Sequence, residues 1–422
     1  MKKIIDMFTK KPLVFSLLAG FILLTSVGIY LRSQGPIVIR LGLYSGSSWD
    51  VPNSKDNRAI DLAIAKFEAA HPNVKVVYES GIPKDDYSAW LADSILLGEQ
   101  TDLFMVPEDD FSLLASTGAL QNLTPYLTKQ TRSSYYPSAL EAGNYQGNYY
   151  ALPFECNPIM MCVNKDLLDK EGLSLPSQTW TLEDFYEICQ AVTKDTDGDG
   201  VIDQYGSTDY DWQKALIAYG GDIYDQDKHQ LTLATSQMRE ALSFISKLEA
   251  LNNNYKVSSD DFDQGKVAFY PMTLAQYRTY KPYPYHVAKY SSFSWTCIQM
   301  PAEQPAYKAT QVQTSLFAMS SQTSHPDLVW ELMTILSQDE AIQQELVNKS
   351  QGMSVLKAVM TSQETQATLN LADMGVNSLT LETLNQVMSD SKVTPRFKHY
   401  KSILVDCDYL INQALDNKTV DT

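Results

Sequence analysis

Residues 37–44 read Ile-Val-Ile-Arg-Leu-Gly-Leu-Tyr, residues 74–78 read Val-Lys-Val-Val-Tyr, and residues 103–106 read Leu-Phe-Met-Val. Each stretch predicts a β-strand, because its apolar and β-branched residues either alternate or run without interruption. Between them, apolar residues recur at helical spacing over 60–70 and 87–95. The order is therefore strand, helix, strand, helix, strand, which favours parallel strands joined by crossover helices and an α/β fold.

The same alternation continues towards the C-terminus. Strands are expected over 149–153 and 159–163, and further helices over 237–251 and 324–338. Thr181 followed by Asp184 predicts the capped start of another helix. A chain of 422 residues suggests two or three lobes. Since no internal repeat or long flexible linker separates them, we expect strands to join the lobes.

The charge distribution divides the chain in two. Lys+Arg number 33 against 50 Asp+Glu, a net charge of −17. Residues 1–32 carry five basic side chains and one acidic one, a sum of +4, so the remainder carries −17 − 4 = −21. An acidic body of this kind excludes nucleic acid as a partner, because binding to phosphate depends on clustered Lys and Arg.

The basic segment leads into a membrane-spanning candidate. No residue from Pro12 to Leu31 is charged at neutral pH, and this apolar run is long enough to cross a bilayer. The lysines before it predict a cytoplasmic N-terminus and an acidic body outside the cell. Ser26-Val27-Gly28 is a poor match to a peptidase site, so an uncleaved anchor is favoured over a cleaved signal peptide. No cysteine precedes Cys156, which excludes a lipoprotein.

Residues typical of enzymes are scarce. The five histidines stand apart, and no G-x-S-x-G, H-E-x-x-H or phosphate-binding loop occurs. The five cysteines lack metal or redox spacing, so we expect buried thiols. Carboxylate neighbours such as Glu108 and Asp109 could serve a surface glycosidase. Such pairs arise by chance among 50 acids, and a hydrolase is the weaker alternative.

An acidic loop is the sharpest local motif. Asp195, Asp197, Asp199 and Asp203 surround Gly198 and Gly200. Carboxylates at positions 1, 3, 5 and 9 around a glycine turn can bind calcium. Position 12 is Gly206 rather than the bidentate Glu of an EF-hand, so an ordinary Asp-Gly turn is the alternative. Either way, the loop is predicted to be structural, and no cofactor is required.

Aromatic and polar residues follow several predicted strands. They are Trp49 with Asp50, Glu108 with Asp109, and Tyr210 with Trp212. In α/β sheets ligands bind beyond the carboxyl ends of the strands. Sugars suit such residues, since their C–H faces stack on aromatic rings while their hydroxyls need polar partners. The alternative is that each aromatic side chain is half-buried packing.

Motifs spread over residues 37–422 resemble the extracellular solute-binding proteins of ABC importers, carbohydrate-binding family 1, typified by maltose-binding protein. The motifs are Phe67-Glu-Ala-Ala-His-Pro-Asn-Val-Lys-Val76, Thr101-Asp-Leu-Phe104, Gly118-Ala-Leu-Gln-Asn-Leu-Thr124, Tyr150-Ala-Leu-Pro-Phe154, Asn164-Lys-Asp-Leu167, Thr179-Trp-Thr181, Ala218-Tyr-Gly-Gly-Asp222, Gln264-Gly-Lys-Val-Ala-Phe269 and Gln351-Gly-Met-Ser-Val355. Each motif is weak alone, and their order and spacing make the set specific.

This resemblance implies a type II periplasmic-binding-protein-like fold with a ligand cleft between two lobes, preceded here by one N-terminal transmembrane helix. The expected division is a cytoplasmic tip and signal-anchor helix at 1–32, lobe I at 33–151 plus 302–350, and lobe II at 152–301 plus 351–422. Family members close around a solute by hinge bending and dock on a membrane permease. Catalysis is not implied.

Carried over by position, the resemblance places ten residues in the cleft. They are Trp49, Asp50, Glu108, Asp109, Glu155, Asn157, Tyr210, Trp212, Gln276 and Tyr277. The expected ligand is a carbohydrate, with an oligosaccharide favoured by the number of aromatics. A sensor that presents its closed form to a membrane receptor, or a binding protein for a peptide or cationic solute, are the alternatives. Gln313-Thr314-Ser315 departs from the glycine pair of many members.

Overall fold

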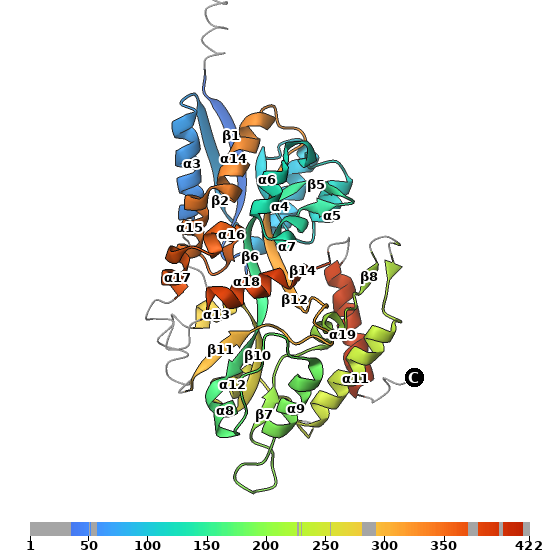
Figure 1. Cartoon of the computed structure of the whole chain (residues 1–422). Helices are drawn as coiled ribbons and strands as arrows, with labels where there is room; N and C mark the ends of the chain where they lie inside the picture. Colours follow the sequence, from blue (N-terminus) through green and yellow to red (C-terminus); the bar gives the residue numbers. More distant parts are fainter. Residues whose placement is uncertain are drawn as a thin grey trace, which may run out of the picture.

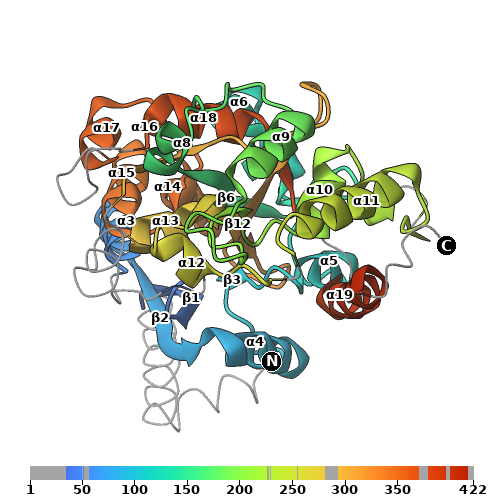
Figure 2. The ribbon, with the colours of Figure 1, turned by 90° about the horizontal axis from the view of Figure 1, so that it is seen from below.

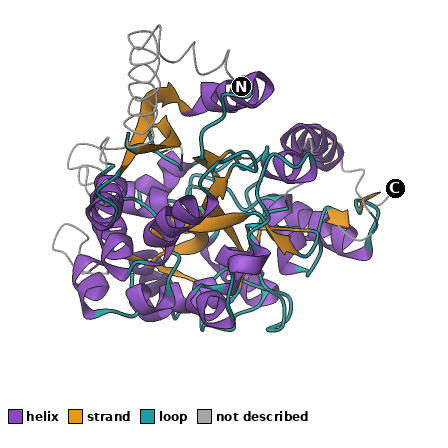
Figure 3. Ribbon diagram, turned by 90° about the horizontal axis from the view of Figure 1, so that it is seen from above, coloured by secondary structure: helices purple, strands orange, loops and turns teal. Residues whose placement is uncertain are grey.

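The computed structural model describes residues 35–49, 51, 57–225, 228, 230–253, 255–280, 293–369, 379–395 and 400–416. They form an α/β molecule in which strands run through the interior and helices cover them (Figures 1 and 3). Within these residues no helix combines the length and apolar character needed to cross a membrane. The predicted anchor at 12–31 lies outside the described residues.

The first lobe begins with the predicted order of elements. They are β1 (Ile37–Ser45), α3 (Arg58–Ala70), β2 (Val74–Pro83), α4 (Lys84–Leu97), β3 (Leu103–Val106) and α5 (Phe111–Ser116). Strand β1 pairs in parallel with β2 and with β3, which confirms the parallel pairing. Parallel strands end at the same edge of the sheet, so the loops after β1 and β3 lie together.

One long strand connects the two lobes. Strand β6 (Ala151–Asn164) pairs with β12 (Thr310–Met319) over its first half and with β10 (Val267–Thr273) over Ile159–Val163. The main sheet has the strand order β2-β1-β3-β12-β6-β10-β7, with β7 at Tyr205–Ser207. The chain therefore passes from one lobe to the other inside a continuous strand, as expected. It returns between β11 (Trp295–Ile298) and β12.

Both faces of the first-lobe sheet are covered. Helices α3, α14 (Pro326–Gln338) and α15 (Glu340–Lys349) cover one face, where Phe67, Leu332 and Leu346 are buried together. Helices α4 and α5 supply the other core through Tyr87 and Phe111. The burial of Ile60, Ala63, Ile64 and Phe67 on α3 follows their helical spacing.

The second lobe has its own aromatic core. Helices α9 (Leu182–Val192), α10 (Trp212–Ala218), α11 (Ser236–Ala250) and α19 (Tyr400–Asp416) contribute to it. Phe185 is fully buried at its centre and contacts the rings of Trp180, Tyr210 and Phe269. The predicted capping box of Thr181 and Asp184 starts α9. Viewed from below, α10, α11 and α19 lie on one side of the molecule (Figure 2).

A third core lies where the lobes meet. It is built by α7 (Pro137–Glu141), α13 (Leu274–Tyr280), α16 (Lys357–Met360), α17 (Gln363–Leu369), α18 (Leu381–Ser389) and β13 (Met353–Ser354). The other elements are η1 (Thr124–Tyr126), α6 (Lys129–Ser134), β4 (Asn144–Tyr145), β5 (Asn148–Tyr149), α8 (Lys165–Lys170), β8 (Tyr224–Asp225), β9 (Gln230–Leu231), α12 (Ser259–Asp263) and β14 (Ser391–Val393). In Figure 1, α13 and α18 lie between the upper and lower lobes.

Candidate functional site

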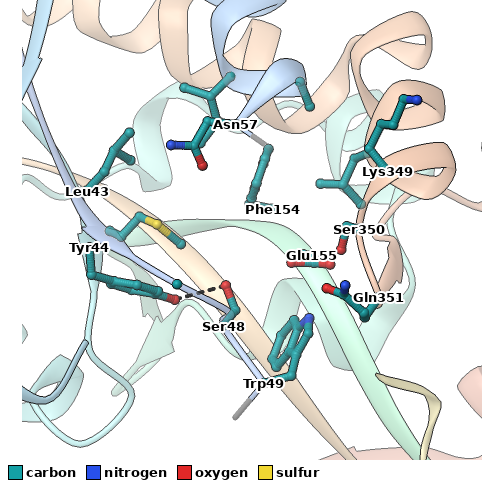
Figure 4. A pocket seen from close by; sticks show the side chains of 15 residues that line it. Leu43, Tyr44, Ser48, Trp49, Asn57, Phe154, Glu155, Lys349, Ser350 and Gln351 are labelled. Atoms are coloured by element: carbon teal, nitrogen blue, oxygen red, sulfur yellow. Dashed lines mark hydrogen bonds between the residues drawn. The ribbon is translucent and has the colours of Figure 1, made fainter. Parts of the chain in front are cut away.

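A pocket of about 80 Å³ lies at the carboxyl ends of β1 and β3, beside the connecting strand β6. Five segments line it: the end of β1 with the loop after it, the start of α3, strand β3, strand β6, and the end of α15 with the residues that follow (Figure 4). The pocket brings together two predicted site residues, Trp49 and Glu155. The sequence placed them more than 100 positions apart, and the parallel sheet topology accounts for their meeting.

Short-range hydrogen bonds fix the loop after β1. The Tyr44 hydroxyl donates to Ser48 Oγ at 3.0 Å, and the Trp49 backbone N–H donates to Ser47 Oγ at 3.1 Å. Lys84 Nζ, from the start of α4, donates to the Ser48 carbonyl at 2.9 Å. These contacts fix the loop that carries Trp49, whose ring lies near Glu155 and Gln351 (Figure 4).

Glu155 is the buried acid of the pocket. Its side chain comes from β6, the residue is 5% exposed, and Oε1 accepts a hydrogen bond from Gly352 N–H at 3.0 Å. Burial raises the pKa of Glu155 to about 7, and Trp49, the Gly352 N–H and the Arg278 charge each oppose that rise. A Cβ on residue 352 would lie 2.4 Å from Glu155 Oε1, so only glycine allows this approach.

Trp49 offers a donor to the pocket. Its Nε1 is buried and makes no regular hydrogen bond, although the indole is near enough to Glu155 to lower the pKa of that carboxyl. A buried donor so placed can be satisfied by Glu155, by a ligand or by water. Ser350 and Gln351 add a hydroxyl and an amide on the facing wall. The pocket therefore presents an aromatic ring, a carboxyl group, several neutral polar groups and, at its edge, the Lys349 side chain.

The predicted cleft residues on and beside α13 make structural hydrogen bonds within the protein. Asn157 is fully buried: its Oδ1 accepts from Ala275 N–H at 2.9 Å, and its amide donates to Gln313 Oε1 at 3.1 Å. The Gln276 side chain accepts from Thr273 N–H at 2.8 Å and thereby caps the helix. Tyr277 is fully buried, and its hydroxyl accepts from Leu379 N–H at 3.2 Å. These polar groups already have protein partners.

Tyr210 and Trp212, which were predicted to line the cleft, do not border the pocket that Trp49 and Glu155 line. Trp212 is 2% exposed, and its indole N–H donates to Asp408 Oδ1 of α19 at 2.6 Å. The Tyr210 ring packs between Phe185 and Phe244. Both residues border a separate cavity of about 820 Å³ between α11 and α19. Their place in the second-lobe core follows from the apolar area they bury.

The remaining predicted cleft residues face another part of the molecule. Glu108 and Asp109 are half-buried just before α5, where their charges help raise the pKa of Tyr400 at the start of α19; burial of Tyr400 is the largest cause. Figure 2 shows α5 beside α19. The acid pair therefore lies where the first lobe approaches α19. Asp50 lies outside the described residues.

Three carboxylates of the acidic loop converge. Oxygen atoms of Asp195, Asp197 and Asp199 lie within 4.8 Å of one another, a spacing that could hold a metal ion. Hydrogen bonds from the backbone N–H groups of Gly200 and Gly198 lower the pKa of Asp195. Asp203, the fourth predicted ligand, is not one of these three. Its carboxylate connects the two ends of the loop, because it accepts hydrogen bonds from Thr196 N–H at 2.9 Å and from Thr196 Oγ1 at 2.7 Å.

Sequence reasoning did not select Lys349, Ser350 and Arg278. The first two lie in the segment that lines the pocket, and the third donates to carbonyls on either side of it. Residues 351–355 were noted as part of a family motif, so a signal for this wall existed. No sequence pattern connects Arg278 to it.

Known proteins resemble this chain in both sequence and fold. A maltotriose-binding protein of Pyrococcus abyssi is 30% identical over 29% of this chain and 26% of its own length. A mannitol-binding protein of Pseudomonas aeruginosa is 25% identical over 52% of each chain. The aligned stretches thus span about a quarter and a half of these relatives.

A cyclic alpha-maltosyl-1,6-maltose binding protein from Arthrobacter globiformis shares the fold over nearly the whole chain. It has a TM-score of 0.73 and 17% identity, and the alignment covers 92% of this chain and 96% of that one. Its two-lobed α/β architecture matches the one described above. Residues 52–343 match the family described as bacterial extracellular solute-binding protein. This chain therefore belongs to the bacterial extracellular solute-binding protein family.

Proposed function

We propose that the protein captures a carbohydrate between its lobes and delivers it to an ABC permease. The observation that carries this proposal is the pairing of Trp49 with buried Glu155 in the pocket beside β6. An indole face stacks on sugar C–H groups, while a carboxyl and amides bond to hydroxyls. The names of the two relatives, a maltotriose-binding and a mannitol-binding protein, support a polyhydroxylated solute.

The pocket is smaller than an ordinary ligand site of about 300–1,000 Å³. We therefore expect it to hold one end of the solute, with the rest lying between the lobes. An oligosaccharide fits this expectation better than a single sugar ring. The role is binding and delivery rather than catalysis.

The proposed location is the outer face of the cytoplasmic membrane. Residues 12–31 would anchor the chain as an uncleaved helix, because they are mostly apolar, carry no charged side chain and follow four lysines. The acidic body would then face the extracellular medium, where it can meet both the solute and the permease.

The test is thermal unfolding of the full-length protein in mild detergent with mono- and oligosaccharides, polyols, amino acids and polyamines. A ligand at about 100 times its dissociation constant stabilises the folded state by roughly 2.7 kcal/mol. We expect a saccharide to raise the melting temperature. Trp49→Ala should remove the shift. The control Trp330→Ala changes a tryptophan of α14 that packs against Tyr126, and it should retain the shift. A shift with polyamines alone would assign a cationic solute instead.

We also propose that Asp195, Asp197 and Asp199 bind a calcium ion that stabilises the acidic loop. The convergence of their oxygens supports this, and hard cations prefer carboxylate ligands. Calcium should raise the melting temperature, and Asp197→Asn should abolish that rise while Asp260→Asn on α12 leaves it intact. If a chelator and added calcium give the same melting temperature, the loop is an ordinary turn.

A further inference from the structure

Arg278 connects the second-lobe side of the molecule to the wall of the pocket. It lies on α13, the helix that follows strand β10. Its guanidinium donates from Nη1 to the Gly352 carbonyl at 2.7 Å and from Nη2 to the Val347 carbonyl at 2.8 Å. A planar guanidinium can make two such bonds in a fixed geometry, which a lysine cannot reproduce.

The two carbonyls bracket the residues that matter for binding. Between Val347 and Gly352 lie Lys349, Ser350 and Gln351, which form the pocket wall opposite Trp49 (Figure 4). Gly352 itself is bound from three sides: its carbonyl accepts from Arg278, and its N–H donates to Glu155 Oε1 and to Ser350 Oγ, both at 3.0 Å. Arg278 therefore holds the wall from behind, without lining the pocket.

Arg278 also sets the charge around Glu155. Burial lowers the pKa of Arg278 to about 10, and the nearby Glu155 opposes that change. In return, the Arg278 charge favours the ionised form of Glu155. Among the described residues that line the pocket, Lys349 carries a positive charge, and its side chain is exposed at the end of α15. A buried guanidinium and a nearby buried carboxyl stabilise each other's charged forms, and removing either one leaves the other charge without compensation.

We propose that Arg278 is a positioning residue of the solute pocket: from α13 it fixes the 349–351 wall and holds Gly352, whose N–H donates to Glu155. This inference rests on the proposed function, since it takes the pocket to be where the solute binds. It also links the two lobes, because a wall held by α13 keeps its shape only while α13 stays in place.

The experiment compares Arg278→Met, Arg278→Lys and the matched control Arg239→Met, which changes an exposed arginine of α11. The first readout is saccharide affinity. Arg278→Met should weaken it by about 10- to 100-fold, because two buried carbonyls lose a charged donor and the wall loses its support. Arg278→Lys should bind with intermediate affinity, and Arg239→Met like the wild type.

The second readout needs no solute. Tryptophan fluorescence is measured as a function of pH. The transition that is present in the wild type and absent from Glu155→Gln is assigned to the titration of Glu155. Arg278→Met should move its midpoint to higher pH, and Arg278→Lys should keep it close to the wild-type value. A purely structural role would lower stability without moving this midpoint.

These readouts separate the inference from the proposed function. If the wild type binds a saccharide and a folded Arg278→Met binds it with the same affinity, the inference is overturned. An unchanged midpoint in that variant also overturns it. If the wild type binds no saccharide, the proposed function fails, and the ligand-free titration alone decides the role of Arg278. Should Arg278→Met fail to fold, Arg278→Lys with wild-type affinity would overturn the inference.

Discussion

Glu155 combines deep burial with a position beside the proposed solute. Its carboxyl receives the Gly352 N–H and lies near Trp49 and Arg278, yet burial still raises its pKa to about 7. An acid that titrates near neutrality can exist in both forms under ordinary conditions. The charged form accepts hydrogen bonds from sugar hydroxyls more strongly, so the local environment of one residue affects how the pocket binds.

The stability of the protein should therefore depend on pH through this residue. Glu155 has a folded-state pKa of about 7, above its ordinary value of 4.5. Between these values the folded state binds the proton more tightly than the unfolded state, so stability falls as pH rises through this window. Glu155→Gln cannot ionise, so its melting temperature minus that of the wild type should increase as the pH rises from 5 to 8. The control Glu187→Gln, on the exposed face of α9, should show no such trend. A constant difference between Glu155→Gln and the wild type across this range would contradict the prediction.

At the scale of elements, α10 is held to α19 by apolar burial and by hydrogen bonds from Trp212 and Gln213 to Asp408. Trp212 begins α10 and donates to Asp408 of α19 at 2.6 Å while its ring is buried among second-lobe residues. The helix pair therefore depends on both apolar burial and the two hydrogen bonds that Asp408 accepts from α10. This is a packing role, in contrast to the solute contact that the sequence suggested for Trp212.

Trp212→Ala should destabilise the protein by about 3–5 kcal/mol, because it removes a large buried ring and leaves Asp408 without its indole donor. Chemical denaturation measures the loss, and half-buried Trp330→Ala should cost less. Saccharide affinity, measured where the variant is still folded, should stay near the wild-type value. Wild-type stability combined with weakened binding would instead make Trp212 a solute contact.

The elements themselves could be predicted more readily than the site. Periodicity predicted β1, α3, β2, α4 and β3, since burial on one side of an element imposes a repeat on its sequence. Periodicity cannot say whether an aromatic residue after a strand faces a pocket or a core: Trp49 borders the pocket, while Tyr210 and Trp212 are buried. Arg278 was beyond prediction, because its role depends on carbonyls about 70 residues away in sequence.

For the whole molecule, the connection between lobes explains how a small pocket could control a large movement. Strand β6 belongs to both halves of the sheet, and Glu155 lies on it a few residues before its partner changes from β12 to β10. Arg278 reaches the same region from α13. The pocket thus adjoins the point about which the lobes would rotate, so a solute bound there can favour one arrangement by its differential affinity.

We expect the two lobes to close when a saccharide binds. Small-angle X-ray scattering of the protein should give a smaller radius of gyration with saturating saccharide than without it, because a ligand held by both lobes favours the closed arrangement. Trp49→Ala at the same saccharide concentration should keep the ligand-free value, since it removes the aromatic side of the pocket. If the saccharide raises the melting temperature but leaves the radius of gyration unchanged, the solute binds to one lobe alone. The permease would then have to recognise the bound solute itself rather than the relative position of the lobes.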